Sequence, residues 1–135
     1  MLRNLLGVVG GFIAFFLIGT VAFFLLRLCW PEYALVEKEM KFSLAMLVAR
    51  LGLSVLCSAG AGWVAVLIAK GDARTSWWLG VLMLLMFIPI HYGLWEKFPV
   101  WYHLVFLLTL APIIGFSGLL ARRTRRVSTQ ADWPA

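Results

Sequence analysis

Residues 51–69 read LGLSVLCSAGAGWVAVLIA and carry no charged side chain. An α-helix rises about 1.5 Å per residue, so this stretch is about 28 Å long and nearly crosses the ~30 Å hydrocarbon core of a bilayer. Three more uncharged stretches, each of more than 20 residues, lie at 4–26, 75–95 and 98–121. Because helices satisfy their own backbone hydrogen bonds, they suit lipid. The sequence therefore predicts an all-α bundle of four transmembrane helices at residues 5–27, 42–69, 75–94 and 99–121, joined by short loops.

The composition of the whole chain agrees with four spans. Of the 135 residues, 63% are hydrophobic and 13% are charged, and the mean hydropathy is +0.94. Soluble domains average about 45–50% apolar and about 25% charged residues, and disordered chains are less hydrophobic still. These values exclude a soluble or a disordered protein. We expect residues 1–126 to form one membrane domain and the polar residues 127–135 to form a disordered cytoplasmic tail.

Lys and Arg residues are distributed unequally between the two sides of the predicted bundle. The side with both termini and the loop after the second span holds seven of them: Arg3, Lys70, Arg74, Arg122, Arg123, Arg125 and Arg126. The opposite side holds four, balanced by four Glu residues. The positive-inside rule places the more basic side in the cytoplasm, so both termini are expected there. The net charge of +6 then indicates the lipid bilayer as partner, with anionic headgroups at Arg122, Arg123, Arg125 and Arg126, and no nucleic acid.

Small residues recur at helical spacing in three of the predicted spans. In lipid, close backbone approach at small residues supplies much of the packing between helices. We expect helix contacts, within the bundle or in a homodimer or with another membrane protein, at Gly7, Gly11, Ser54, Ser58, Gly62, Ala111, Gly115 and Gly118. Aromatic residues gather at the span ends, and the outer set is typical of an interfacial belt: Trp30, Tyr33, Tyr92, Trp95, Trp101 and Tyr102.

Few polar side chains fall where they could carry chemistry within the bilayer. His91 and His103 lie six residues either side of Lys97 in the last hairpin, so they should reach similar depth. Arg50 lies at a comparable depth, where it could either snorkel to the interface or join the two histidines and Glu96 in a ligand-binding patch. The histidines could equally be interfacial hydrogen-bonding groups beside the aromatic belt.

Several classes of function are disfavoured by what the spans contain. No acidic residue lies inside any of them, whereas a proton-coupled four-helix exporter of the small multidrug type needs a buried carboxylate. Two histidines without a third ligand are a weak metal signal. No phosphate-binding glycine loop or serine-nucleophile motif occurs. The sequence therefore predicts no catalytic residue, no metal and no cofactor, and an enzyme is disfavoured.

Residues 59–65, AGAGWVA, are similar to a Gly-Gly-Trp-Val-Ala-Ala segment in a loose group of small bacterial four-helix membrane proteins without an assigned activity. In that group an aromatic-Pro pair follows the first helix and Pro-x-Trp-aromatic precedes the last one. Trp30-Pro31 and Pro99-Val100-Trp101-Tyr102 resemble these pairs. The resemblance implies a bacterial inner-membrane location and the four-helix fold, and no particular activity.

Two functional hypotheses follow. The first is a structural or accessory subunit that packs through its small-residue helix faces. The alternative is a lipid carrier or a redox or cofactor-binding membrane component, with a site near the outer leaflet at His91, His103 and Arg50.

Overall fold

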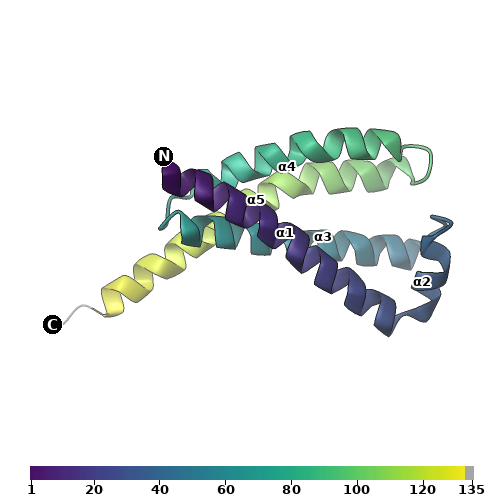
Figure 1. Ribbon diagram of the computed structural model, residues 1–135, viewed down its shortest axis with the longest axis horizontal. Coiled ribbons are helices and arrows are strands. Elements are labelled where there is room, and N and C mark those ends of the chain that lie inside the picture. Colours follow the sequence, from purple (N-terminus) through teal and green to yellow (C-terminus); the bar gives the residue numbers. More distant parts are fainter. Residues whose placement is uncertain (133–135) are drawn as a thin grey trace.

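The computed structural model describes residues 1–132, and in this range all regular secondary structure is helical, without strands. The helices are α1 (Leu2–Cys29), α2 (Pro31–Glu37), α3 (Leu44–Ile68), α4 (Arg74–Gly93) and α5 (Val100–Ala131), shown in Figure 1. All but the short α2 are long and apolar enough to cross a membrane. The predicted all-α architecture with four spans is thus confirmed.

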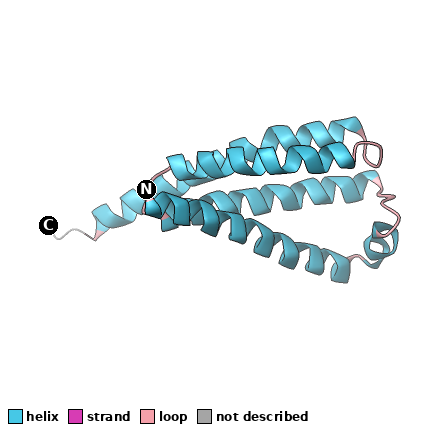
Figure 2. Cartoon of the chain, turned by 45° about the horizontal axis from the view of Figure 1, so that its top comes forward, coloured by secondary structure: helices cyan, strands magenta, loops and turns pink. Residues whose placement is uncertain are grey.

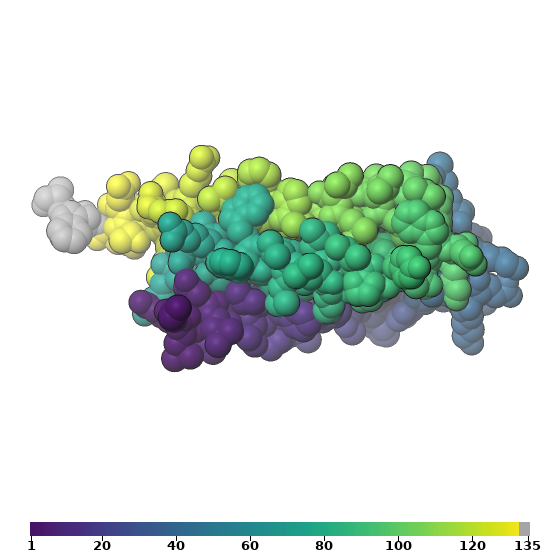
Figure 3. All heavy atoms as spheres, turned by 90° about the horizontal axis from the view of Figure 1, so that it is seen from above, coloured from purple at the N-terminus to yellow at the C-terminus, as the bar shows by residue number. Residues whose placement is uncertain are grey.

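The bundle has two distinct ends. The N-terminus, the α3–α4 turn and the last turns of α5 lie at one end, which we call the terminal end (Figure 1). The short α2 and the α4–α5 turn lie at the other, which we call the α2 end (Figure 2). From above, the final part of α5 projects beyond the other helices at the terminal end (Figure 3).

Local sequence signals explain how the elements around α2 and α3 begin. Pro31 occupies the first turn of α2, where its missing N–H and fixed φ are tolerated. The Ser43 side chain accepts a hydrogen bond of 3.4 Å from the backbone N–H of Met46 and so caps α3. After α3, Gly71 adopts a φ of +94°, a conformation that glycine reaches without a steric penalty. The chain can therefore turn within a few residues into α4.

The α3–α4 turn is tied to the N-terminus through Asp72. Its carboxylate accepts hydrogen bonds from the backbone N–H of Arg74 at 3.0 Å and from Asn4 Nδ2 at 2.8 Å. These two donors hold the pKa of Asp72 below its ordinary value of 3.8. The contact fixes the start of α1 against the turn at the terminal end.

Glycines allow α1 and α3 to approach closely in the terminal half of the bundle. A Cβ added at Gly7 would lie 2.6 Å from the Ala65 carbonyl oxygen, and one at Gly11 would lie 2.8 Å from that of Ala61. Neither distance is possible without movement of backbone. Gly62 of α3 faces the Ile114 carbonyl of α5 in the same way.

The remaining small residues of the predicted packing set also lie at contacts within the chain. Ala111 of α5 contacts Gly80 of α4, Gly115 faces the Trp77 ring, and Gly118 faces the side chain of Ser76. The hydroxyls of Ser54 and Ser58 donate to carbonyls of their own helix, both at 2.7 Å. Packing between the four spans therefore uses most of the small-residue faces.

The end of the chain differs from the disordered tail expected from residue 127. Helix α5 continues through Ala131, while Trp133 and the last two residues lie outside the described range. No Gly or Pro interrupts residues 119–132. In the last turns the hydroxyls of Thr124, Ser128 and Thr129 donate to carbonyls one turn back. A continuous run of residues that tolerate a helix thus extends the span beyond its apolar part.

Candidate ligand-binding cavity

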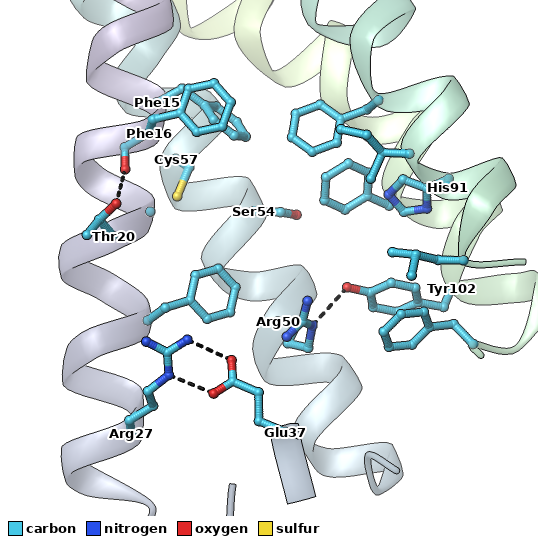
Figure 4. A pocket seen from close by; sticks show the side chains of 17 residues that line it. Phe15, Phe16, Thr20, Arg27, Glu37, Arg50, Ser54, Cys57, His91 and Tyr102 are labelled. Carbon is cyan, nitrogen blue, oxygen red and sulfur yellow. Dashed lines mark hydrogen bonds and ion pairs between the residues drawn. The ribbon is translucent and has the colours of Figure 1, made fainter. Parts of the chain in front are cut away.

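A cavity of about 440 Å³ opens between α1, α3 and the α4–α5 hairpin (Figure 4). It exists because α1 diverges from that hairpin toward the α2 end, as Figures 1 and 2 show. On the deeper side the two walls meet at Phe15 and Phe87, whose ring centroids are 5.6 Å apart. The volume falls within the roughly 300–1,000 Å³ typical of small-molecule sites.

The cavity is polar at the α2 end and apolar toward the middle of the bundle. Arg27, Glu37 and Arg50 lie at the α2 end, and Phe15 and Cys57 line the deeper part (Figure 4). The lining residue Phe87 packs against Phe15, and Phe106 packs against Phe87. Its mouth lies between two membrane-spanning helices, where the lining residues Phe16 of α1 and Ile90 of α4 are 42% and 44% exposed. The cavity thus opens sideways, toward the space that lipid would fill.

Arg50 points from α3 into the polar end of the cavity, between α1 and the hairpin (Figure 4). Its Nη1 donates a hydrogen bond of 2.5 Å to Tyr33 Oη, and its Nε donates one of 3.3 Å to Tyr102 Oη. The guanidinium also lies 4.8 Å from the ring centroid of Phe42 and 5.1 Å from that of Phe23. Aromatic faces attract cations, so phenol oxygens and ring faces hold this charge in place.

No carboxylate among the described residues forms an ion pair with Arg50. The nearest acidic group of the lining, Glu37, is engaged by Arg27, whose Nε and Nη2 donate to its two oxygens at 2.7 and 2.8 Å. This pairing lowers the pKa of Glu37, and the charge of Arg50 lowers it further. A half-buried cation without a counterion is costly away from water. Arg50 therefore remains available for an anion.

The two phenols beside Arg50 are hydrogen-bond donors with free protons. Tyr33 is fully buried, and this burial raises its pKa above 10.0, although the Arg50 charge opposes the shift. Tyr33 is therefore a neutral phenol at physiological pH. Since the oxygens of Tyr33 and Tyr102 accept from Arg50, their protons are not used in these two bonds, and Tyr102 itself lines the cavity. The polar end is thus rich in donors.

His91 and His103 are in direct contact, and their Nδ1 atoms are 2.7 Å apart. One proton must lie between these atoms. His103 is fully buried, stacks on Trp95 with centroids 5.0 Å apart, and has no hydrogen-bond partner for Nε2. A buried bare lone pair is less costly than a buried unpaired N–H. The favoured arrangement is therefore His103 donating from Nδ1 to His91, which leaves His91 protonated at Nε2.

This geometry argues against a metal held by the histidine pair. A zinc–nitrogen bond is about 2.0–2.1 Å long, so two Nδ1 atoms in direct hydrogen-bonding contact leave no room for an ion between them. Within the described part of the chain no group of three His, Cys, Asp or Glu side chains is placed to hold one either.

The structure brings together three of the four residues proposed from the sequence as a ligand patch. Arg50 and His91 both line the cavity, and His103 lies behind His91. Glu96 lies apart from them, exposed on the α4–α5 turn and outside the lining.

Sequence reasoning missed the other polar residues of the site. The aromatic-belt pattern gives no sign that the phenol oxygens of Tyr33 and Tyr102 accept hydrogen bonds from Arg50. Arg27 and Glu37 were counted only in the charge balance. Arg27 and Glu37 have opposite charges and lie on either side of the Trp30-Pro31 turn. This arrangement is the sequence feature that indicates an ion pair.

Comparison of the chain with protein-family models, with curated proteins and with solved structures finds no significant match in any of the three.

Proposed function

We propose that this protein binds a membrane amphiphile, with an anionic group at Arg50 and an apolar part in the deeper cavity and its mouth. The observation that carries the proposal is a half-buried arginine without an acidic partner at the polar end of a cavity that opens between membrane-spanning helices. Ionisable residues inside spans are costly and mark ligand sites.

The polarity of the cavity matches the orientation of a lipid in a leaflet. Arg50 lies six residues after the start of α3, about 9 Å into the helix, and Cys57 lies about 10 Å deeper. A lipid entering from the side would therefore place its headgroup near Arg50 and its chain toward Phe15 and Phe106 without turning over. The cavity accommodates a ligand portion of drug-like size, so longer chains would extend through the mouth.

Two other roles considered from the sequence receive less support. The small-residue faces that suggested an accessory subunit are largely occupied within the bundle, by contacts such as that of Gly11 with Ala61. The redox version of the alternative needs the histidines as ligands, yet their Nδ1 atoms bond each other. Lipid binding is the version that the geometry favours.

For the location we propose a bacterial inner membrane, with both termini in the cytoplasm and the cavity in the outer leaflet. The seven Lys and Arg residues of the terminal end support this orientation through the positive-inside rule. A reporter fused after Ala135 should then be active only as a cytoplasmic-type fusion. Activity of a periplasmic-type reporter at this position would overturn the orientation without affecting the cavity.

Native mass spectrometry from mild detergent tests the function. The wild-type protein is expected to retain an anionic lipid, and Arg50→Gln to lose it. Lys97→Gln removes the same charge from an exposed residue of the α4–α5 turn outside the cavity and should retain the lipid. Arg50→Lys, which keeps the charge without the planar fork, should retain it weakly. Equal retention by folded Arg50→Gln and Lys97→Gln would refute the proposal.

A further inference from the structure

Three side chains that line the cavity carry a formal charge: Arg27, Glu37 and Arg50. Arg27 and Glu37 cancel each other through two hydrogen bonds. The lining therefore has a net charge of one, and that charge is located at Arg50.

We infer that the headgroup bound at this site is a monoanion, either the carboxylate of a fatty acid or the phosphodiester of a phospholipid. The inference rests on the proposed function and adds a rule of charge to it. One negative charge neutralises Arg50. A dianion would bring a second negative charge out of water into a cavity with largely apolar walls, and burying a charge without a partner is costly.

A zwitterionic headgroup meets a different obstacle. Its phosphate could bind Arg50, but its ammonium group would find no free carboxylate in the lining to pair with. Glu37 already accepts from Arg27 with both oxygens. The hydrogen-bond donors around Arg50 also favour an anion. Among the described residues, Tyr102 accepts only from Arg50, so its own proton is free to donate to a headgroup oxygen.

Glu37 is the residue that sets this selectivity. Without its charge, Arg27 would contribute a second free cation on the α1 side of the cavity, and a dianion would become the better match. Glu32 lies on the same short helix but is exposed and outside the lining. Glu32→Gln is therefore a control with the same change in net charge.

The test is a competition at pH 8.5, with the purified full-length protein given equimolar oleate, phosphatidylglycerol, phosphatidic acid and phosphatidylcholine in mixed micelles. Phosphomonoesters have a second pKa near 6, so phosphatidic acid carries about two charges at this pH. Native mass spectrometry measures which lipid is retained. The wild-type protein should prefer oleate or phosphatidylglycerol over phosphatidic acid by roughly 10-fold, because the second charge of phosphatidic acid would lose its hydration without gaining a partner.

The variants separate the rule of charge from other effects of substitution. Glu37→Gln should lose the preference for a monoanion over phosphatidic acid, whereas Glu37→Asp and Glu32→Gln should keep it. The double variant Arg27→Gln, Glu37→Gln again has Arg50 as its single charge, so it should return to the wild-type preference.

The outcomes distinguish this inference from the proposed function. Retention of phosphatidic acid by the wild type at the level of the monoanions, or the same preference in Glu37→Gln and Glu32→Gln, would overturn the charge rule while lipid binding stands. If no anionic lipid is retained by the wild type, both proposals fail. Dominance of oleate or of phosphatidylglycerol identifies the monoanion as a carboxylate or a phosphodiester, and either result supports the inference.

Discussion

Replacement of Gly11 by Ala should loosen the contact between α1 and α3 that holds the bundle together at its terminal half. The new Cβ would lie 2.8 Å from the Ala61 carbonyl oxygen and 2.9 Å from the Ala65 Cβ. Both belong to the core of α3, so the two helices must separate. Overpacking of this kind costs about 1–3 kcal/mol. The gain in helix propensity of about 0.5–1 kcal/mol offsets part of it.

Gly52 provides the matched control for this substitution. It lies in α3 as an exposed residue, and a Cβ added there meets nothing within 4 Å. Gly52→Ala should therefore show the helix-propensity gain alone, a stabilisation of about 0.5–1 kcal/mol. The difference between the two variants isolates the steric term, because the chemical change is identical.

The assay is reversible unfolding by titration of sodium dodecyl sulfate into mild-detergent micelles, followed by tryptophan fluorescence. We expect Gly11→Ala to unfold at a lower fraction of dodecyl sulfate than the wild type, and Gly52→Ala at an equal or higher one. If Gly11→Ala is as stable as Gly52→Ala, the close approach of α1 to α3 at Gly11 is refuted. The position of α1 as one wall of the cavity would then also be in question.

Two further predictions concern buried and terminal polar groups. His91→Phe leaves both ring nitrogens of the fully buried His103 unpaired and should lower the free energy of unfolding by about 1–3 kcal/mol. The double variant His91→Phe, His103→Phe should lose less stability than the sum of the two single variants. Additive losses in the same unfolding assay would contradict the hydrogen bond. The second concerns acid. The folded-state pKa of Asp72 lies below 3.8 because the Arg74 amide and Asn4 donate to its carboxylate. The ionised carboxylate therefore stabilises the fold above pH 3.8, and this stabilisation is lost as pH falls through the lower folded-state pKa. The stability advantage of the wild type over Asp72→Ala should shrink on acidification below pH 3.8, and a constant advantage would contradict this prediction.

The four spans could be predicted from the sequence because charge spacing alone determines them. A span needs about 20 uncharged residues, and the intervals in this chain leave little choice. The close contacts at Gly7 and Gly11 were expected for a similar reason, since small residues at helical spacing favour packing in lipid. Their partners were not predictable, because the choice between contacts within the chain and with a second copy depends on the crossing of whole helices.

The cavity could not be predicted, because it results from where α1 stops following α4. Up to Phe15 and Phe87 the two helices are in contact, and beyond them α1 diverges toward α2 (Figure 1). No residue in that part of α1 signals a divergence in isolation. The length of the uncharged stretch after Arg50 also allows this side chain to snorkel to the interface, and its contact with Tyr33 depends on the position of α2, which the sequence does not specify.

The short helix α2 determines the surroundings of Arg50 on which the proposed binding site rests. Tyr33 on α2 accepts a hydrogen bond from Arg50 and is itself fully buried, so α2 supplies one of the two phenols that hold the guanidinium in place. Four residues later Glu37 pairs with Arg27. This ion pair fastens α2 to α1, and it engages the carboxylate of the cavity lining with Arg27 and not with Arg50. Both contacts arise because Pro31 begins α2 directly after α1 and folds the chain back across the end of the bundle. Arg50 therefore lines the cavity without an ion-pair partner among the described residues, and the anionic headgroup that we propose would supply its counterion.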